Sequence, residues 1–594
     1  MTIVSIFWGL SSGAALYKDG EIVAAVSEER FTREKNDSCF PALSIEWILN
    51  TYDVKVTDID KIAMVSNDVG MDYIFLAKHK WSIEDYLEEN NNYWKKKLVA
   101  NSTFSKNLYF DVMSHKIKAD QYPENYWKEK IKQKNVDSFV EDKNKLVANF
   151  FNLPEDKVVN IEHHRSHASY SYYTSSFRNE KVLAFTADGW GDGKNATIGI
   201  FDETGKYEMV HVNTQCNIAR IYRYMTLLLG MKPSEHEFKV MGLAPYGKEK
   251  YAKKALEIFR STLYVDGLEF KWKIKPADSY YWFRDKLEGV RFDNIAWALQ
   301  TWTEELLAQW VKNAIKKYDI HKIIFSGGVS MNVKAMGQIA KLEEVDDIFI
   351  GGSAGDESHI ISTAYCVAQD YSETWNSNNI KSLDNLYLGT EFSKKDEKEV
   401  LKRLDLSKYE IIENYSNKQV AKLIYDGNII ARSVGRMEFG QRSLGNRSII
   451  ADPSKLDVKE KINSAIKNRD FWMPFAPVIL DNYSKEYLIN PKNLKSPYMT
   501  LAFDTTPLGY DAMKASCHPS DKTCRAQILY KNSNEGLYDL LEEFALISGR
   551  GALMNTSFNL HGYPIVNSPT DAIYVFEHSD LDCLVLNNYL IIKN

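Results

Sequence analysis

The chain has 594 residues, of which 44% are hydrophobic and 26% charged, and this composition is typical of a folded globular protein and excludes a wholly disordered one. Its length is several times that of an average domain and predicts more than one hydrophobic core. The 74 basic and 80 acidic residues give a net charge of -6, so we expect no nucleic-acid partner, because nonspecific binding to phosphate backbones needs an excess of positive charge.

The N-terminal residues alternate apolar runs with turns of small residues. Residues 3–8 are apolar, a small-residue turn follows at 9–13, and two further apolar runs at 14–18 and 21–29 are separated by the dipeptide Asp19-Gly20. Short apolar runs broken by Asp-Gly predict a β-hairpin. Between 78 and 149 the composition shifts to Lys, Glu, Asn, Trp and Tyr with aromatics at helical spacing, which predicts a helical insertion.

Glycine-rich turns follow apolar strands at two later places, in residues 182–201 and 322–332. Repeated glycine turns after buried strands indicate an α/β core with an edge that faces a ligand. Residues 369–384 are polar and rich in turn formers, and a new pattern of helices and short strands starts at 386. We therefore expect an α/β protein with one domain at 1–384 and a second at 385–594.

The six cysteines are scattered without CxxC spacing, which argues against a zinc ribbon or a disulfide framework and favours a reducing compartment. The first residues lack a basic leader with a cleavage box, and no run approaches 18 uninterrupted apolar residues. We therefore expect a cytoplasmic protein that has no membrane partner.

The segment IEHHRSHASYSYY places His163 and His167 four residues apart, on one face if the segment is helical. Two such imidazoles can hold one metal together with a carboxylate, and Asp188 and Asp356 follow apolar strands in glycine-rich turns. A packed or solvated histidine pair is the commoner outcome for an isolated HxxxH. The spacing does not decide among Fe(II), Mn(II) and Zn(II).

Glycine turns and basic residues form two further candidate groups. The turns DGWGDG, SGGVSMN and GGSAGD include Gly189, Gly327 and Gly328, whose backbone N–H groups could approach phosphate oxygens, although each turn could be only a tight connection. Arginine forks suit phosphate, and the alternative is a surface salt-bridge network. The basic and neutral donors that could make a phosphoanhydride or acyl phosphate site are Arg436, Arg442, Arg447, Lys467, Arg469, His518, Arg525, Ser557 and Asn559.

The order of the motifs resembles the nodulation and antibiotic O-carbamoyltransferase family over nearly the whole chain. The motifs are EERFTREKNDSCFP, HHRSHA, DGWGDG, EHEFKVMGLAPYG, SGGVSMN, AGD, GRMEFGQRSLGNRSIIADP, FWMPFAP and NTSFN. The resemblance implies an N-terminal actin-like (ASKHA-type) duplicated domain followed by a YrdC-like α/β domain. It also implies a two-step reaction, in which carbamoyl phosphate and ATP, the latter as its Mg(II) complex, give carbamoyl-adenylate, and the carbamoyl group then passes to a hydroxyl of a small molecule.

The resemblance also implies roles for individual residues. Iron(II) would be held by His163 and His167 with Asp356 and Asp188. Lys35, Lys239 and Asn332 fall in motifs that line the adenylate and acceptor site, where the two lysines would be catalytic. The carbamoyl phosphate and ATP pocket would be formed by Arg442, Lys467, Arg469, Arg525, Ser557 and Asn559, with Arg442, Lys467 and Arg525 catalytic; Asp188, Gly189, Gly327, Gly328, Asn332 and Arg447 complete the predicted binding residues.

One departure concerns acceptor activation. The family commonly reads GHDSSAAL where this chain reads GLSSGAAL, so Leu10 replaces a histidine that is a candidate base. An apolar side chain cannot take a proton, and His236, Glu237 or Asp192 would have to substitute. Smaller departures are Gln441, Ser443 and the sequence HPSDKTCRAQ, and we expect none of these to abolish adenylation.

Two alternatives to an O-carbamoyltransferase stay open at this point. One is an actin-like sugar kinase or ATPase, which would release ADP. The other, motivated by Leu10, is a nucleotide-binding protein that has lost transfer. The aromatic residues between 270 and 292 suit the face of a sugar acceptor but are equally consistent with core packing. The sequence predicts neither the acceptor's identity nor the oligomeric state.

Overall fold

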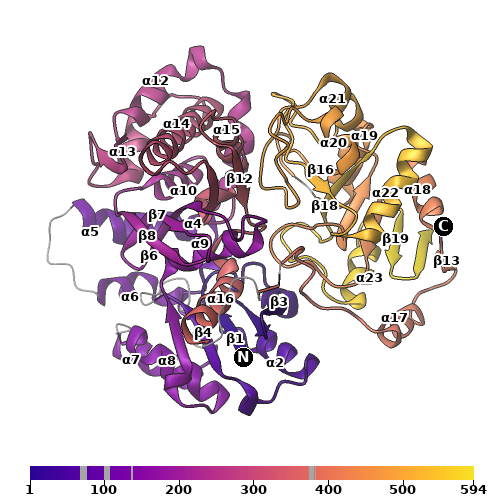
Figure 1. The fold of residues 1–594 in the computed structure, drawn as a ribbon, viewed down its shortest axis with the longest axis horizontal. Helices are drawn as coiled ribbons and strands as arrows, with labels where there is room; N and C mark the ends of the chain where they lie inside the picture. Colours follow the sequence, from indigo (N-terminus) through magenta and orange to yellow (C-terminus); the bar gives the residue numbers. More distant parts are fainter. Residues whose placement is uncertain are drawn as a thin grey trace. The chain divides into compact units, whose positions relative to one another are not determined.

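The computed structural model describes residues 1–66, 76–99, 107–118, 120–134, 138–372, 380–381, 383–467 and 469–594. The chain forms two compact units (Figure 1). Unit 1 comprises Met1–Glu29, Asn36–Ile350 and Ala354–Ser382, and unit 2 comprises Arg30–Lys35, Gly351–Ser353 and Leu383–Asn594. Within the described residues, we find no helix whose length and apolar character would let it span a bilayer.

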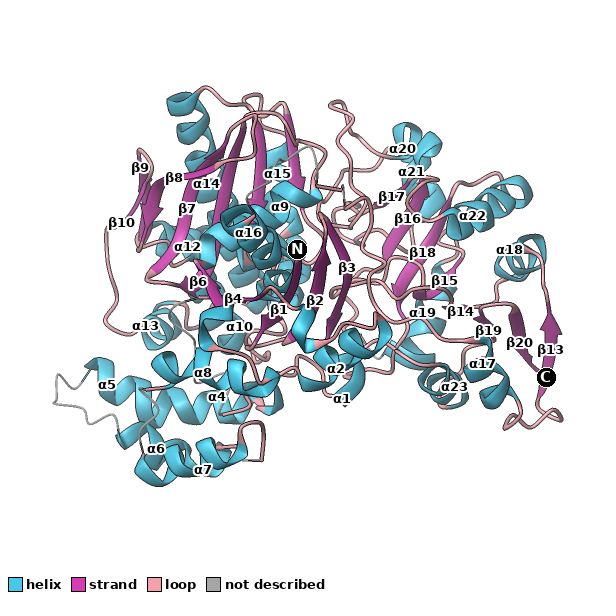
Figure 2. Cartoon of the chain, turned by 60° about the horizontal axis from the view of Figure 1, so that its bottom comes forward, coloured by secondary structure: helices cyan, strands magenta, loops and turns pink. Residues whose placement is uncertain are grey.

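The first sheet of unit 1 confirms the predicted hairpins (Figure 2). Its strands, in the spatial order β3-β2-β1-β4-β5, are β3 Glu21–Ser27, β2 Gly13–Lys18, β1 Thr2–Phe7, β4 Lys61–Val65 and β5 Val158–Ile161. The three N-terminal strands are antiparallel, and β4 and β5 join parallel to β1. Residues 3–7 of β1 are all buried, as expected for a strand of a sheet that is covered on both faces.

The second sheet of unit 1 repeats this pattern of strand order and direction. Its strands, in the order β12-β11-β6-β7-β8, are β12 Asp347–Ile350, β11 Lys322–Ser326, β6 Val182–Gly191, β7 Lys194–Phe201 and β8 Tyr207–Asn213. Here too three strands form antiparallel pairs, and two later strands join parallel to the first of them. Two helices lie between the sheets and contact each other: α9 (His163–Thr174) packs on β6, β7 and β11, and α16 (His359–Tyr371) packs on β1, β2 and β4.

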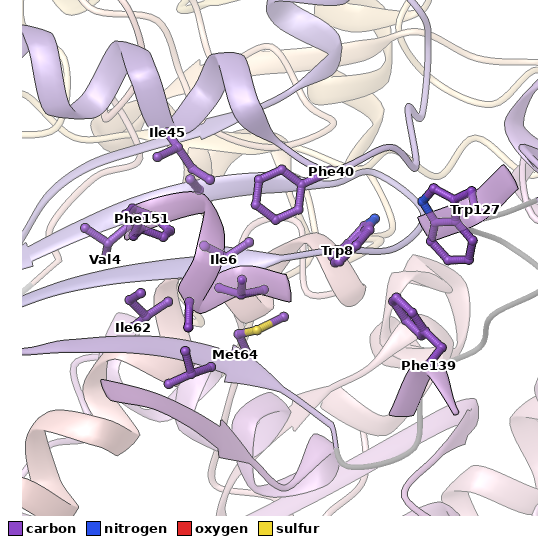
Figure 3. Packing of buried hydrophobic residues seen from close by; sticks show 14 of the residues in the cluster. Val4, Ile6, Trp8, Phe40, Ile45, Ile62, Met64, Trp127, Phe139 and Phe151 are labelled. Carbon is purple, nitrogen blue, oxygen red and sulfur yellow. The ribbon is translucent and has the colours of Figure 1, made fainter. Parts of the chain in front are cut away.

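The described part of the segment between β4 and β5 is helical. Its helices are η2 Lys78–Lys80, α4 Ile83–Glu89, η3 Asn90–Trp94, α5 Lys95–Val99, α6 Asn107–Met113, η4 Ser114–Lys116, α7 Glu124–Gln133, α8 Phe139–Phe151 and η5 Glu155–Lys157. Trp127 and Phe139 share one hydrophobic cluster with Trp8 and Phe40 (Figure 3). The Trp8 ring centre lies 5.1 Å from that of Phe139 and 5.0 Å from that of Phe40. These helices are therefore part of the core that covers the first sheet.

The remaining elements of unit 1 support the two sheets. They are α1 Glu29–Thr32, α2 Ala42–Thr51, η1 Val56–Asp58, α10 Ile218–Leu228, α11 Glu237–Leu243, η6 Ala244–Tyr246, α12 Glu249–Arg260, β9 Leu263–Asp266, β10 Glu269–Trp272, α13 Ser279–Lys286, α14 Phe292–Tyr318, η7 Gly328–Met331, α15 Val333–Ala340 and η8 Asp356–Ser358. The aromatic residues of 270–292 divide: Phe270 and Phe283 are buried, whereas Trp272 is half-buried.

Unit 2 contains one eight-stranded sheet with helices on both faces. The strand order is β13 Tyr409–Glu413, β20 Tyr589–Lys593, β19 Cys583–Leu586, β14 Ile430–Ser433, β15 Arg447–Ala451, β18 Ala552–Ser557, β16 Ala476–Leu480 and β17 Gln527–Leu529. Neighbouring residues of β15 enter different cores, Ile449 on one face and Ile450 on the other. The helices are α17 Lys394–Leu401, α18 Asn417–Asp426, α19 Leu456–Ile462, η10 Asn463–Lys467, α20 Asp481–Tyr487, α21 Pro507–Met513, α22 Glu535–Ser548 and α23 Pro569–Glu577.

Candidate metal and anion sites

The first candidate site lies where helices α9 and α16 begin. His163 is the first residue of α9, and His359 is the first residue of α16. His167 follows one turn into α9, Asp188 stands near the end of β6, and Asp356 opens η8 just before α16. The partial positive charge at two helix N-termini favours anions, so this position suits carboxylates and phosphate.

Three imidazole nitrogens converge on one carboxylate oxygen. The Nε2 atoms of His167, His359 and His163 lie 3.4, 3.7 and 3.8 Å from Oδ1 of Asp356. Oδ2 of Asp188 lies 3.1 Å from Nε2 of His167 and 3.9 Å from Nε2 of His163. Ligand atoms held ~2.1 Å from a tetrahedral metal are roughly 3.4 Å apart, so these spacings match those of atoms that share one ion.

The unsatisfied atoms of this group support the same reading. Nε2 of His163, Nε2 of His359 and Oδ1 of Asp356 are buried and have no hydrogen-bond partner among the described residues. A buried polar atom without a partner is costly, and a cation bound among these atoms would remove that cost. The residues present therefore fit a divalent metal, although the chemistry of this donor set suits more than one transition ion.

The imidazoles and carboxylates of this site shift one another's pKa values. Burial alone would lower the pKa of His167, but the carboxylates of Asp188 and Asp356 raise it to about 9. Burial would raise the pKa of Asp188, whereas the neighbouring imidazoles of His163 and His167 hold it well below its usual range. Burial and the charge of His167 lower the pKa of His359 to about 3, so this imidazole is neutral and can offer a lone pair.

Hydrogen bonds behind the ligands fix their orientation. Oγ of Ser166 lies 2.8 Å from Nδ1 of His359 and 2.7 Å from Oγ of Ser362. A partner at Nδ1 directs Nε2 of His359 toward the carboxylates, which is the usual arrangement behind a metal-binding histidine. The carboxylate of Asp192 accepts a hydrogen bond from the backbone N–H of His163 at 2.9 Å and another from Ser66 at 2.7 Å.

The three glycine turns meet at this site because β6, β11 and β12 are parallel neighbours, whose carboxyl ends share one edge. The backbone N–H of Gly328 donates to Asp188 at 3.0 Å, and that of Gly189 donates to the same carboxylate at 2.5 Å. Gly327 has a φ of +90°, and a Cβ there would lie 2.5 Å from the carbonyl oxygen of Ala187. In this structure the glycines therefore support the Asp188 carboxylate directly.

The second candidate site is a group of cationic side chains in unit 2. Nζ of Lys467, which is 3% exposed, donates to Oδ1 of Asn559 at 2.8 Å and to the backbone oxygen of Ser557 at 2.5 Å. The guanidinium of Arg469 donates to Oγ1 of Thr556 at 2.9 Å. Nη1 of Arg525 is buried and finds no hydrogen-bond partner in the part of the chain that the structure describes. Within the described chain, none of these three cations is paired with a carboxylate.

Burial and mutual repulsion lower the pKa values of the basic side chains in this cationic site. Burial, Arg469 and Lys35 lower the pKa of Lys467 well below its usual value. Burial and Arg442 lower the pKa of Arg469 to about 10, and burial together with Arg442 and Arg469 lowers that of Arg525 strongly. Like charges kept together away from water are unfavourable unless an anion joins them, so this group of side chains suits an anionic ligand.

Other predicted residues have different surroundings. The fully buried Arg447 donates to the backbone oxygens of Val434 (2.7 Å) and Gly435 (3.1 Å), and so holds a loop rather than facing the cationic site. Asn332 caps α15 and exchanges hydrogen bonds with Gln300 at 2.9 and 3.0 Å. Lys35 belongs to unit 2, beside Lys467, whereas Lys239 is half-buried on α11 in unit 1.

The candidate substitutes for the base missing at Leu10 also differ. Both carboxylate oxygens of Asp192 are engaged, as described above. Nδ1 of His236 accepts from the backbone N–H of Lys232 at 3.1 Å. Oε1 of Glu237 accepts from Ser234, and burial raises the pKa of this carboxyl, which brings it closer to the range that suits a general base at neutral pH.

Sequence reasoning missed His359. This residue follows Asp356 by three positions in GDESH and shares one helical turn with it. The spacing DxxH in front of an apolar helix was an available signal, but a histidine next to isoleucines reads equally well as core. Only the fold brings it to within 3.7 Å of the Asp356 carboxylate.

Comparison with known proteins agrees with a transferase assembled from these two parts. The family model described as carbamoyltransferase N-terminus matches residues 4–365, and that described as carbamoyltransferase C-terminus matches residues 421–593. The chain therefore belongs to the carbamoyltransferase family, as the motifs predict, and it is an enzyme of the transferase class.

Three relatives illustrate the range of the family. An uncharacterized protein of Methanocaldococcus jannaschii, MJ1051, is 32% identical over 100% of this chain and 99% of its own. Nodulation protein NolNO of Sinorhizobium fredii is 27% identical over 98% of this chain and 78% of its own. The 3'-hydroxymethylcephem-O-carbamoyltransferase of Streptomyces clavuligerus is 25% identical over 59% of this chain and 63% of its own.

Proposed function

We propose that this protein is an ATP-dependent O-carbamoyltransferase that works in two steps. The cationic site of unit 2 carries the proposal, because Lys467, Arg469 and Arg525 are held together without a carboxylate and so require an anionic ligand. Carbamoyl phosphate and the triphosphate of ATP supply such charge. Within a carbamoyltransferase family, these are the substrates that the site suits best.

In the first step, unit 2, proposed to be a YrdC-like domain spanning 385–594, makes carbamoyl-adenylate. Water releases phosphate from carbamoyl phosphate, and the resulting carbamate oxygen attacks the α-phosphorus of Mg(II)-bound ATP and expels pyrophosphate. Arg442, Arg469 and Arg525 offset the charge on the phosphates, and Lys467, whose Nζ is held by Ser557 and Asn559, adds positive charge beside them. Removing water's competition for these donors makes each contact stronger.

In the second step, unit 1 transfers the carbamoyl group to an acceptor hydroxyl. The repeated wiring of its two sheets supports an actin-like (ASKHA-type) duplicated domain over 1–384. His163, His167, Asp188 and Asp356, joined by His359, would hold a divalent metal, for which we propose iron(II). When bound, that ion would supply Lewis-acid stabilisation of phosphate charge. The chain itself contributes the N-termini of α9 and α16, which favour the negative charge left on the adenylate.

The acceptor is proposed to be a hydroxyl of a sugar, glycoside or natural product, in line with the relative named as a hydroxymethylcephem O-carbamoyltransferase. Glu237 is the proposed base in place of the histidine absent at Leu10, since burial raises the pKa of its carboxyl. The reaction is proposed to occur in the cytoplasm, because all six cysteines are free, as suits a reducing compartment.

Purified protein incubated with ATP and carbamoyl phosphate, and no acceptor, tests the first step. We expect pyrophosphate release that depends on carbamoyl phosphate, and its loss in Arg525→Ala. Arg403→Ala, which removes an exposed arginine of the same unit, is the control. Formation of ADP instead of pyrophosphate would replace the proposal by a kinase or ATPase. Equal pyrophosphate release by Arg525→Ala would remove this residue from the pocket.

A further inference from the structure

A surface cavity of about 170 Å³ opens beside the end of β6, the strand that also carries Asp188. It is smaller than the ~300–1,000 Å³ typical of sites for drug-sized ligands, so it suits a single ring rather than a whole molecule. Trp190 near the end of β6 and Trp272 at the end of β10 contribute indole rings, and Asn217 and Ser279 contribute neutral polar groups. An indole face packs against the C–H face of a sugar ring while polar neighbours meet its hydroxyls.

Two cations line the same cavity without a counter-ion. Arg220 and Lys275 both face it, and in the described chain neither forms an ion pair with a carboxylate. The guanidinium of Arg220 lies 5.2 Å from the centre of the Trp190 ring and donates through Nε to the backbone oxygen of Gly189 at 3.2 Å. This contact fixes the arginine by one edge, so that the rest of its planar fork can meet an oxyanion.

The polar wall of the cavity is ordered by hydrogen bonds. Oε1 of Gln215 accepts from Nε1 of Trp272 and from Nζ of Lys275, each at 3.1 Å. These contacts join the segment after β10 to the loop before α10, so the indole and the ammonium group are positioned before a ligand arrives. A site formed in advance loses less entropy on binding than one that must be ordered.

The cavity is connected to the candidate metal site through consecutive backbone. Arg220 holds the carbonyl of Gly189, the residue directly after Asp188, and the Asp188 carboxylate lies 3.1 Å from Nε2 of His167. We propose that the cavity is the acceptor subsite and that it binds one sugar ring carrying a carboxylate or a phosphate. This inference rests on the proposed function, because it assigns the acceptor of that same reaction.

Direct binding to the full-length protein, without ATP or carbamoyl phosphate, tests the inference independently of catalysis. Methyl β-glucuronide, glucose 6-phosphate and methyl β-glucoside are titrated in turn and followed by ligand-observed NMR. We expect at least one anionic probe to bind about tenfold more tightly than the neutral glucoside, equivalent to about 1.4 kcal/mol. Which of the two binds identifies the carboxylate or the phosphate as the recognised group.

Matched variants locate the binding. The double substitution Arg220→Ala with Lys275→Ala should abolish the preference for the anionic probe, and Trp272→Ala should weaken all sugar binding. Lys273→Ala, which removes a neighbouring lysine that lies over the Tyr264 ring, is the control and should bind as the wild type does. Melting temperatures confirm that each variant is folded.

Three results would overturn the assignment: no probe binds, the glucoside binds as tightly as the anionic sugars, or the anion preference survives in the Arg220 and Lys275 variant. Binding of AMP but of no sugar would also overturn it, since the cavity would then hold nucleotide. Pyrophosphate release by the wild-type protein is measured separately. Its absence would refute the proposed function, whereas loss of sugar preference with pyrophosphate release intact would refute only the acceptor subsite.

Discussion

Replacing His359 by alanine should weaken metal binding more than any change behind the ligands. His359 is fully buried, and its Nε2 has no hydrogen-bond partner in the described residues. It points at the same Asp356 oxygen as Nε2 of His163 and His167. If the three imidazoles share one ion, His359→Ala removes a nitrogen donor. If His359 is only a core residue, the substitution leaves the ion untouched and costs packing alone.

The size of the effect follows from the hydrogen bonds around this ring. Removing a group that merely orients a metal-binding histidine costs ~10–100-fold in affinity, so Ser166→Ala should fall in that range. Loss of the ligand itself should reach at least the upper end, ~100-fold, which is about 2.7 kcal/mol. Stability without metal should change less than a core deletion would, because the substitution also removes a buried nitrogen that lacks a partner.

The assay is a competition for Zn(II) or anaerobic Fe(II) between the apo-protein and a chromophoric chelator, with metal content per chain as a second readout. His164→Ala is the matched control: this residue neighbours His163 on α9 and is equally buried, but among the described residues no ion pair joins it to Asp188 or Asp356, whereas His359 is joined to Asp356. We expect His164→Ala to retain wild-type affinity. Unchanged metal affinity in His359→Ala, or an equal loss in His164→Ala, would refute the reasoning.

Three other predictions follow from the same geometry. Gly191→Ala should impair metal binding, because a Cβ at this position would lie 2.2 Å from the His163 ring. Gly189→Ala should leave metal binding unchanged, because a Cβ there would meet no atom within 4 Å of it. Chelator competition measures both variants. Arg447→Met should lower the free energy of unfolding, measured in urea, by ~1–3 kcal/mol or more, because buried backbone carbonyls lose their donor. Arg525→Met should leave the stability of the ligand-free protein equal or higher, because it removes the repulsion between Arg525 and the guanidinium groups of Arg442 and Arg469. The free-state pKa of Lys467 is lowered and an anion favours its charged form, so carbamoyl phosphate should bind with proton uptake. Its affinity should fall as pH rises from the ligand-free pKa of Lys467 to the higher ligand-bound pKa, and should change no further above the latter. Calorimetry in buffers of different ionisation heat measures the uptake, and Lys467→Met should reduce it.

The sequence predicted the local elements well where period and turn chemistry agree. The apolar runs on either side of Asp19-Gly20 form the hairpin of β2 and β3, and the glycine turns after β6, β11 and β12 lie at a common edge. The assignment of 78–149 as an insertion and of 384 as a domain boundary stays a prediction. Periodicity predicts the helices of 78–149 but not their packing, since these helices share a hydrophobic core with Trp8, which directly follows β1.

The candidate sites show what sequence could not supply. The four-residue spacing of His163 and His167 predicts that they lie on one helix face. His359 lies beside them only because α16 packs against α9. Arg447 and Arg525 are both arginines in polar surroundings, and the sequence grouped them together. The fold separates them by their acceptors: Arg447 donates to backbone carbonyls, whereas Nη1 of Arg525 finds none. Partner geometry, rather than residue type, therefore decides which cations stay available for a ligand.

The two sites also differ in charge in a way that suits the order of the proposed reaction. Unit 2 gathers Arg442, Lys467, Arg469 and Arg525 with no carboxylate paired to the last three, so a triphosphate and an acyl phosphate together are needed to neutralise it. In unit 1 Asp188 and Asp356 both lie near the imidazole of His167, and their two charges would balance a divalent ion. A balanced site holds an anion mainly through the N-termini of α9 and α16, which is a weaker attraction. We therefore expect the highly charged substrates to bind tightly in unit 2. We expect unit 1 to hold the singly charged carbamoyl-adenylate more loosely, so that the products of transfer can leave.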